Sequence, residues 1–133
     1  MKYLTMIREV QNTCELDAED SAHAIKVVLE TLGERLPATE RKHIADQLPV
    51  EFKHSLGKRD YVSDFDLEQF YTRVASRERI RYAQAVERTR CIMGLLQQAV
   101  SAGEIKDIKT ILPAEYGELF GQAPEGPLSP SAV

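Results

Sequence analysis

The chain has 133 residues and a formal net charge of −4, with 17 lysines and arginines against 21 aspartates and glutamates. Hydrophobic residues make up 43% and charged residues 29%, so one globular domain is expected to bury a core without a metal or a disulfide. The acidic balance gives no general attraction to nucleic acid or to a membrane, and no apolar run approaches the length of a membrane span. The first residues lack the apolar core of a signal peptide, which favours a cytoplasmic protein.

Four helices are predicted in the first half of the chain. Apolar residues at i, i+3, i+4 and i+7 predict a helix over about residues 2 to 13. A longer helix is predicted over about 17 to 35, because apolar residues at alternating spacings of four and three line one face. These residues are Ala18, Ala22, Ile25, Leu29, Leu32 and Leu36. Proline corners at Leu36-Pro37 and Leu48-Pro49 then predict a short helix to about Gln47 and another ending near Gly57, since proline stops one helix and suits the start of the next.

The second half of the chain repeats the first. A shift of 64 residues aligns residues 1–57 with residues 65–121 without a gap, and it places Leu48-Pro49 on Leu112-Pro113. Ser63, with an acid three residues later, is the predicted N-cap of the fifth helix. The pattern of the long helix recurs at Tyr82, Val86, Thr89, Met93, Leu96 and Val100.

The predicted fold is therefore all-α, an eight-helix bundle made of two pseudo-symmetric four-helix repeats. Residues 1–121 are expected to form a single helical domain, with repeat one at 1–57, a linker at 58–64 and repeat two at 65–121. A flexible Pro-rich tail is predicted at 122–133, because this segment has no apolar periodicity.

No catalytic chemistry is predicted from the sequence. Cys14 and Cys91 have no paired spacing, so both are predicted to be reduced thiols, with Cys91 as a small core residue. The histidines His23, His43 and His54 are predicted to be surface or boundary residues. The chain has no glycine-rich phosphate loop and no nucleophile elbow. We therefore predict no catalytic residue, no cofactor and no metal, and a protein that is not an enzyme.

Three stretches carry a resemblance to a known family. They are residues 22–36, the phrase Gln47-Leu48-Pro49, and residues 112–120, which read Leu-Pro-Ala-Glu-Tyr-Gly-Glu-Leu-Phe. In this order they resemble the bacterial family catalogued as domain of unknown function 2267, over about residues 3 to 121. The resemblance implies an all-α fold and an uncharacterised function. It supplies no catalytic residue, cofactor or substrate.

The two repeats differ sharply in charge at one aligned place. Residues 9–26 hold five acids against one lysine, whereas the aligned residues 73–90 hold six arginines against two glutamates. The predicted partner-binding residues are these arginines: Arg73, Arg77, Arg79, Arg81, Arg88 and Arg90. Concentrated guanidinium groups favour contact with an acidic surface.

Several interpretations of this arginine-rich edge remain open. The first is a protein-interaction or regulatory module that binds a protein partner or another copy of the chain through charged edges. The second is a nucleic-acid-associated protein, which the acidic total disfavours. The third is a small-ligand carrier with a pocket between the long helices near Met93 and Gly94. A merely solvated surface is the plain alternative to all three.

Overall fold

The structure, a computed structural model, describes residues 1–121, and the tail predicted at 122–133 lies outside the described residues. Within residues 1–121 it has eight helical segments and no strand, which confirms the all-α prediction. The segments are α1 (Tyr3–Cys14), α2 (Ala18–Arg35), α3 (Ala38–Gln47), α4 (Val50–Leu56), α5 (Leu67–Glu78), α6 (Tyr82–Ala99), α7 (Ala102–Ile111) and η1 (Ala114–Phe120).

Helix boundaries recur along the chain with the period of the sequence repeat. The helices α1 and α5 each have 12 residues, α2 and α6 each have 18, and α3 and α7 each have 10. Each boundary in the second set lies 64 residues after its counterpart, as Tyr3 and Leu67 do. Even the left-handed residues that end α1 and α5 correspond, Glu15 at φ 58° and Arg79 at φ 60°.

Hydrogen-bonding side chains fix two of the predicted helix starts. Asp17 caps α2, because its carboxylate accepts a hydrogen bond from the backbone N–H of Asp20 at 2.7 Å. The helix α5 begins later than predicted: Asp66, and not Ser63, is its N-cap. Asp66 and Gln69 form a reciprocal capping box, with bonds of 2.8 and 3.0 Å. Phe65, just before this cap, is buried in the core, and helix α5 begins after it.

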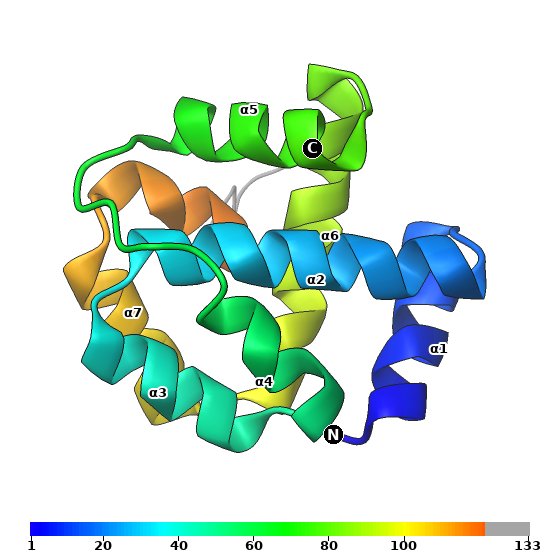
Figure 1. Ribbon diagram of the computed structural model, residues 1–133, viewed down its shortest axis with the longest axis horizontal. Helices are drawn as coiled ribbons and strands as arrows, with labels where there is room; N and C mark the ends of the chain where they lie inside the picture. The colour runs from blue at the N-terminus through cyan, green and yellow to red at the C-terminus, as the bar shows by residue number, and fades with distance from the viewer. Residues whose placement is uncertain (122–133) are drawn as a thin grey trace.

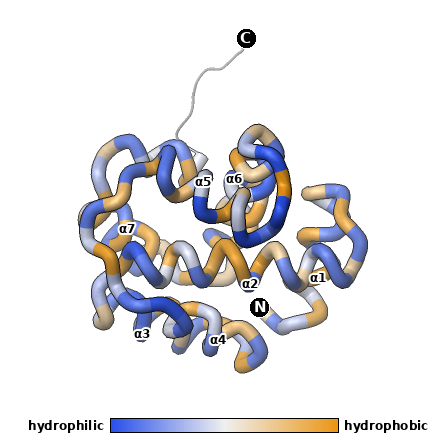
Figure 2. Tube along the Cα trace, turned by 45° about the horizontal axis from the view of Figure 1, so that its top comes forward, coloured by the Kyte–Doolittle hydropathy of each residue, from blue (hydrophilic) through white to orange (hydrophobic). Residues whose placement is uncertain are grey.

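The long helix α2 lies at the centre of the bundle (Figure 1). In this view α5 runs alongside it, α6 crosses it, and α3 and α4 lie on the opposite side from α5. Contacts join α2 to α1, α4, α5 and α6. The hydropathy colours alternate along α2, so polar and apolar residues share this central position (Figure 2). No helix within residues 1–121 combines the length and the hydrophobicity that a bilayer crossing needs.

Burial of α2 extends beyond the single apolar face that the sequence predicts. Every residue from Val27 to Leu36 is buried, including the charged ones. The linker accounts for this, because it runs over the outer face of the helix instead of standing free in solvent. The backbone N–H of Val62 donates to the Glu34 carbonyl at 2.7 Å, and Lys58 and Arg59 lie 3.4 and 3.2 Å from the Glu30 carboxylate.

One glycine permits the close contact between α2 and α4. A Cβ atom added at Gly33 would lie 2.0 Å from the carbonyl oxygen of Leu56, far inside van der Waals contact. The aligned residue in α6 is Gln97, whose side chain donates to the Met93 carbonyl of the same helix. The two repeats also differ in the segment that follows: α4 is an α-helix, whereas its counterpart η1 is a 3₁₀ helix. The predicted eighth helix is thus present, with tighter winding.

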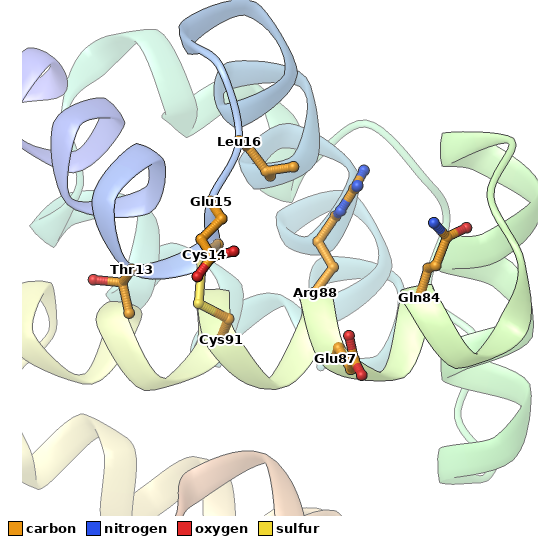
Figure 3. Close-up of a pocket in the computed structure, with 8 residues that line it drawn as sticks. All are labelled: Thr13, Cys14, Glu15, Leu16, Gln84, Glu87, Arg88 and Cys91. Carbon is orange, nitrogen blue, oxygen red and sulfur yellow. A yellow bond between two sulfur atoms is a disulfide. The ribbon is translucent and has the colours of Figure 1, made fainter.

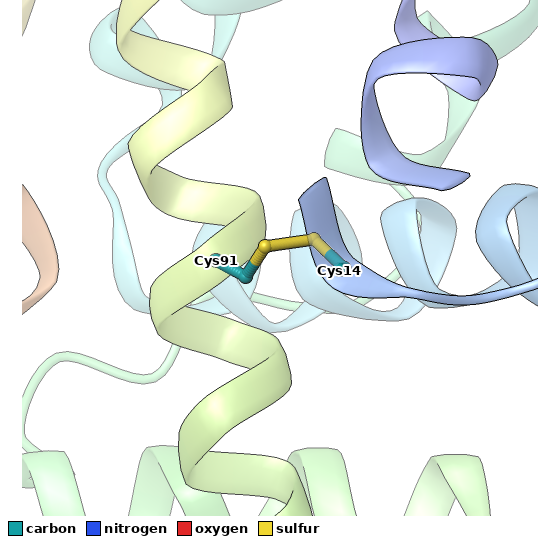
Figure 4. The surroundings of a disulfide bond; sticks show 2 residues. All are labelled: Cys14 and Cys91. Carbon is teal, nitrogen blue, oxygen red and sulfur yellow. A yellow bond between two sulfur atoms is a disulfide. The ribbon is translucent and has the colours of Figure 1, made fainter. Parts of the chain in front are cut away.

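A disulfide joins Cys14, the last residue of α1, to Cys91 in the middle of α6 (Figure 4). The two Cα atoms are 6.0 Å apart although the residues are separated by 77 positions. The prediction of two reduced thiols is therefore wrong for this structure. Spacing along the chain carried no sign of the pair, because the repeat aligns neither cysteine with another cysteine. The packing of α1 against α6 is what brings them together.

Gly33→Ala is expected to destabilise the protein by about 1–3 kcal/mol, because the added methyl group forces two helix backbones apart. Gly94→Ala is the matched control. Gly94 is an exposed residue inside α6 with open space around its Cα, so alanine there is expected to stabilise the helix by about 0.5–1 kcal/mol. Urea unfolding followed by circular dichroism measures both. Equal effects from the two variants would contradict the close-contact argument.

Reduction of the disulfide is expected to lower the free energy of unfolding by about 2–4 kcal/mol, because the unfolded chain loses a long covalent loop. The measurement compares urea unfolding of the oxidised chain with that of the Cys14→Ser/Cys91→Ser variant. A thiol assay on the unfolded wild-type chain establishes its redox state. Two free thiols in a chain purified without reductant would argue against the cross-link.

Candidate functional site

Two of the six predicted arginines are anchored on α2 and do not face solvent freely. Arg73 and Arg77 stand one turn apart on α5, and both reach the buried Glu34 carboxylate. The distances from their nitrogens to the nearer carboxylate oxygen are 3.7 and 3.0 Å. Arg77 also donates to the Thr31 hydroxyl at 2.9 Å. The side chains of Arg73 and Arg77 are only 31% and 16% exposed.

Aromatic contacts complete this anchor. The Arg73 guanidinium lies over the Phe65 ring, 3.9 Å from its centroid, which is a favourable cation–π distance. The Arg35 guanidinium lies 5.8 Å from the centroid of the same ring, and Arg35 donates to the Phe65 carbonyl at 2.9 Å. The Tyr116 hydroxyl donates to that carbonyl as well, at 2.7 Å. Phe65 is therefore the point where α2, α5 and η1 meet.

Two further arginines, on α6, also have carboxylate partners within the chain. Arg88 donates to Glu78, the last residue of α5, at 3.3 Å, and His23 from α2 approaches the same oxygen at 3.1 Å. Arg90 donates to Glu118 of η1 at 3.1 Å. These pairs join separate helices, so they hold the bundle together.

The Glu118 carboxylate also accepts a hydrogen bond from the Tyr71 hydroxyl. Burial alone would raise the pKa of Glu118, but the hydrogen bonds from Tyr71 and Arg90 outweigh it and leave that pKa below its ordinary value. Burial, followed by the bond to Glu118, raises the pKa of Tyr71. At neutral pH the cluster is therefore an ionised carboxylate held between an arginine and an un-ionised tyrosine, which fixes η1 against α5 and α6.

Arg79 and Arg81 differ from the other four arginines. Both are exposed, and within residues 1–121 no ion pair involves either side chain. Their backbone is nonetheless fixed: the N–H of Arg79 donates to the Ala75 carbonyl, and the N–H of Arg81 donates to the Gln84 side chain at 3.1 Å. We call Arg79 and Arg81, at the turn between α5 and α6, the basic corner.

The aligned turn between α1 and α2 is acidic. Glu15, Asp17, Glu19 and Asp20 are all exposed there, and in the described part of the chain none of them forms an ion pair. Only the Asp17 carboxylate is engaged, as the cap of α2. We call these four residues the acidic corner. The disulfide at Cys14 fixes this corner to α6.

A pocket of about 420 Å³ lies between the acidic corner and the first half of α6 (Figure 3). It is lined by Thr13, Cys14, Glu15, Leu16, Gln84, Glu87, Arg88 and Cys91. In Figure 3 the Arg88 and Gln84 side chains rise from α6 toward the side of α2. This pocket differs in place from the one predicted for a ligand carrier. Between α2 and α6, the space near Ile92 and Leu96 measures only about 10 Å³, and Met93 is fully buried.

Three potential metal ligands lie between α3 and α7, although no metal site was predicted from the sequence. Glu40, His43 and Glu104 place one ligand atom each within 4.8 Å of one another. A sequence signal for them existed: Glu40 and His43 have the Glu-x-x-His spacing that puts two ligands on one helix face. Glu104 is the aligned counterpart of Glu40 in the second repeat.

Arg77→Ala is expected to lower the free energy of unfolding by about 1–3 kcal/mol, because it removes a partner from the buried Glu34. Arg79→Ala is the control, since this exposed arginine has no ion pair in the described chain, and a change within about 0.5 kcal/mol is expected. Thermal or urea unfolding measures both variants. Equal losses would show that the division between structural and free arginines is wrong.

The comparisons with known proteins reach the family level. No curated protein matches the chain. A family model described as an uncharacterized conserved protein (DUF2267) matches residues 3–119. This range contains every described helix except the last residue of η1, together with both corners and the ligands between α3 and α7. The chain therefore belongs to the DUF2267 family, as the sequence resemblance predicted.

Proposed function

We propose that the protein is a non-enzymatic protein-interaction module that binds an acidic protein surface through the basic corner. The observation that carries the proposal is the division among the six arginines. Four are held by carboxylates of the chain itself, whereas Arg79 and Arg81 are exposed and have no ion pair within residues 1–121. Unpaired guanidinium groups on a fixed backbone are suited to bidentate hydrogen bonds with carboxylates.

The partner surface that best fits the basic corner is the acidic corner of another copy. Glu15 and Asp17 are exposed, and they occupy the positions aligned with Arg79 and Arg81. Opposite charges on two separate corners of one molecule produce a head-to-tail contact, which leaves one free corner at each end. Association through exposed charges is expected to weaken as salt screens them.

We infer that an approximate two-fold axis relates the two repeats. Two features support this inference: the recurring helix boundaries, and reciprocal packing in which α1 contacts α6 while α5 contacts α2. Under such an axis the acidic and basic corners are equivalent places of opposite charge. A crystal structure in which a rotation of about 180° did not superpose α2 on α6 would overturn the inference.

We propose the cytoplasm as the compartment, because the acidic composition gives no general attraction to a membrane. The disulfide favours an oxidising compartment instead, because disulfide bonds persist mainly there. The basic corner does not depend on it, since helix caps fix Arg79 and Arg81. The acidic corner does depend on it, through Cys14. Alkylation of free thiols in freshly lysed cells, followed by mass spectrometry, shows whether Cys14 and Cys91 are oxidised or reduced in the cell.

The variant Arg79→Glu/Arg81→Glu is expected to weaken association by at least about tenfold, equivalent to about 1.4 kcal/mol, at low salt. Sedimentation velocity at low and high salt measures self-association of the full chain. The control is Lys53→Glu/Lys106→Glu, which changes the net charge equally at two exposed lysines on α4 and α7. Adding Glu15→Arg/Asp17→Arg to the corner variant is expected to restore association if copies pair with each other.

Other outcomes separate the alternatives. A wild-type chain that stays monomeric at low salt would remove self-association and leave an acidic protein of another kind as the partner. Loss of single-stranded oligonucleotide binding in the Arg79→Glu/Arg81→Glu variant would favour the nucleic-acid hypothesis instead. If the corner variant and the lysine control behave alike in every assay, the basic corner is only a solvated surface.

A further inference from the structure

The helices α3 and α7 pack against each other and bring two glutamates and a histidine together. Glu40 and His43 come from successive turns of α3, and Glu104 comes from the first turn of α7. His43 Nδ1 lies 3.2 Å from Glu104 Oε1. Two ligand atoms that each lie about 2.1 Å from a tetrahedral zinc ion are about 3.4 Å apart. The separation between the histidine and the glutamate therefore suits two ligands of one ion.

Glu104 is a buried carboxylate whose bonding capacity is only half used. The residue is 5% exposed. One of its oxygens faces His43, while the other, Oε2, is buried and has no hydrogen-bond partner. A buried charge without full compensation is costly, so a group that supplies positive charge at this oxygen would stabilise the fold. Burial raises the pKa of Glu104, and the charge on Glu40 raises it further, against the lowering effect of His43.

An ion pair between protonated His43 and Glu104 explains only part of this arrangement. It compensates one negative charge and leaves that of Glu40, which is only half-buried and lies in the same group of three. It also leaves Glu104 Oε2 without a partner. A divalent cation would balance both carboxylates at once. The His43 side chain is 49% exposed, so an ion can reach it from solvent.

We propose that Glu40, His43 and Glu104 form a binding site for a divalent transition-metal ion, with Zn²⁺ as the expected occupant. Mixed carboxylate and imidazole ligands favour this class of ion over Mg²⁺, which prefers oxygen alone. Three protein ligands leave one position of a tetrahedral ion for water. Asp107, aligned with His43 in the second repeat, is one turn beyond Glu104 on α7, and its charge acts on Glu104.

Isothermal titration of the full oxidised chain with Zn²⁺ tests the site. One ion per chain is expected, and His43→Ala and Glu104→Gln are each expected to weaken binding by at least about tenfold. His54→Ala is the matched control, because His54 is an exposed histidine on another helix. The oxidised form is required, since free thiols at Cys14 and Cys91 would themselves bind zinc.

Two further measurements keep the test independent of folding. Urea unfolding without metal is expected to find Glu104→Gln at least as stable as the wild type, because the variant removes a buried charge. Added Zn²⁺ is expected to raise the melting temperature of the wild type and of His54→Ala, but not that of His43→Ala or Glu104→Gln. A titration with Mg²⁺ is expected to give no saturable binding. Failure of Zn²⁺ to saturate, or equal affinity in His43→Ala and His54→Ala, would overturn the site.

Discussion

The structure depends on the enclosure of α2. A helix that is buried on every side in its second half must compensate each polar group it carries without help from water. Glu34 is the clearest case: the charges of Arg73 and Arg77 from α5 balance its carboxylate, although its Oε1 accepts no hydrogen bond. This requirement fixes where α5 lies, and the linker that leads to α5 must then run along α2. Phe65, which follows the linker, contacts Arg73 of α5 and Arg35 of α2 through its ring.

The two long helices have diverged around this constraint. The polar residues of α2, Glu30, Thr31, Glu34 and Arg35, align with Gly94, Leu95, Gln98 and Ala99 in α6. Because α6 carries no charge at those positions, it needs no arginines opposite it, and Gly94 and Gln98 remain exposed. Two of the six arginines, Arg73 and Arg77, therefore balance an acid of the first repeat, and Arg88 and Arg90 balance acids of the second. What remains after this internal balance is the small basic corner.

The sequence predicted the helices well because their signals are local. Caps, proline corners and apolar spacing act within a few residues, so the ends of α2 and α6 followed from the pattern alone. The roles of individual charges did not, because they depend on contacts between distant segments. Nothing near Arg77 in the sequence reveals Glu34, and the repeat register gave Cys14 no partner. For Glu40 and His43 a local signal did exist, but only the packing of α7 showed which carboxylate completes the group.

The disulfide also changes the covalent topology of the molecule. It closes residues 14–91 into a ring that contains α2, α3, α4, α5 and the linker between the repeats. Lys58, Asp60 and Tyr61 in that linker are exposed, so this is where a protease would meet the backbone. A single cut there opens the ring but separates nothing, because the bond between α1 and α6 still joins the two pieces. In its oxidised form the molecule can be nicked between its repeats and remain one covalent particle.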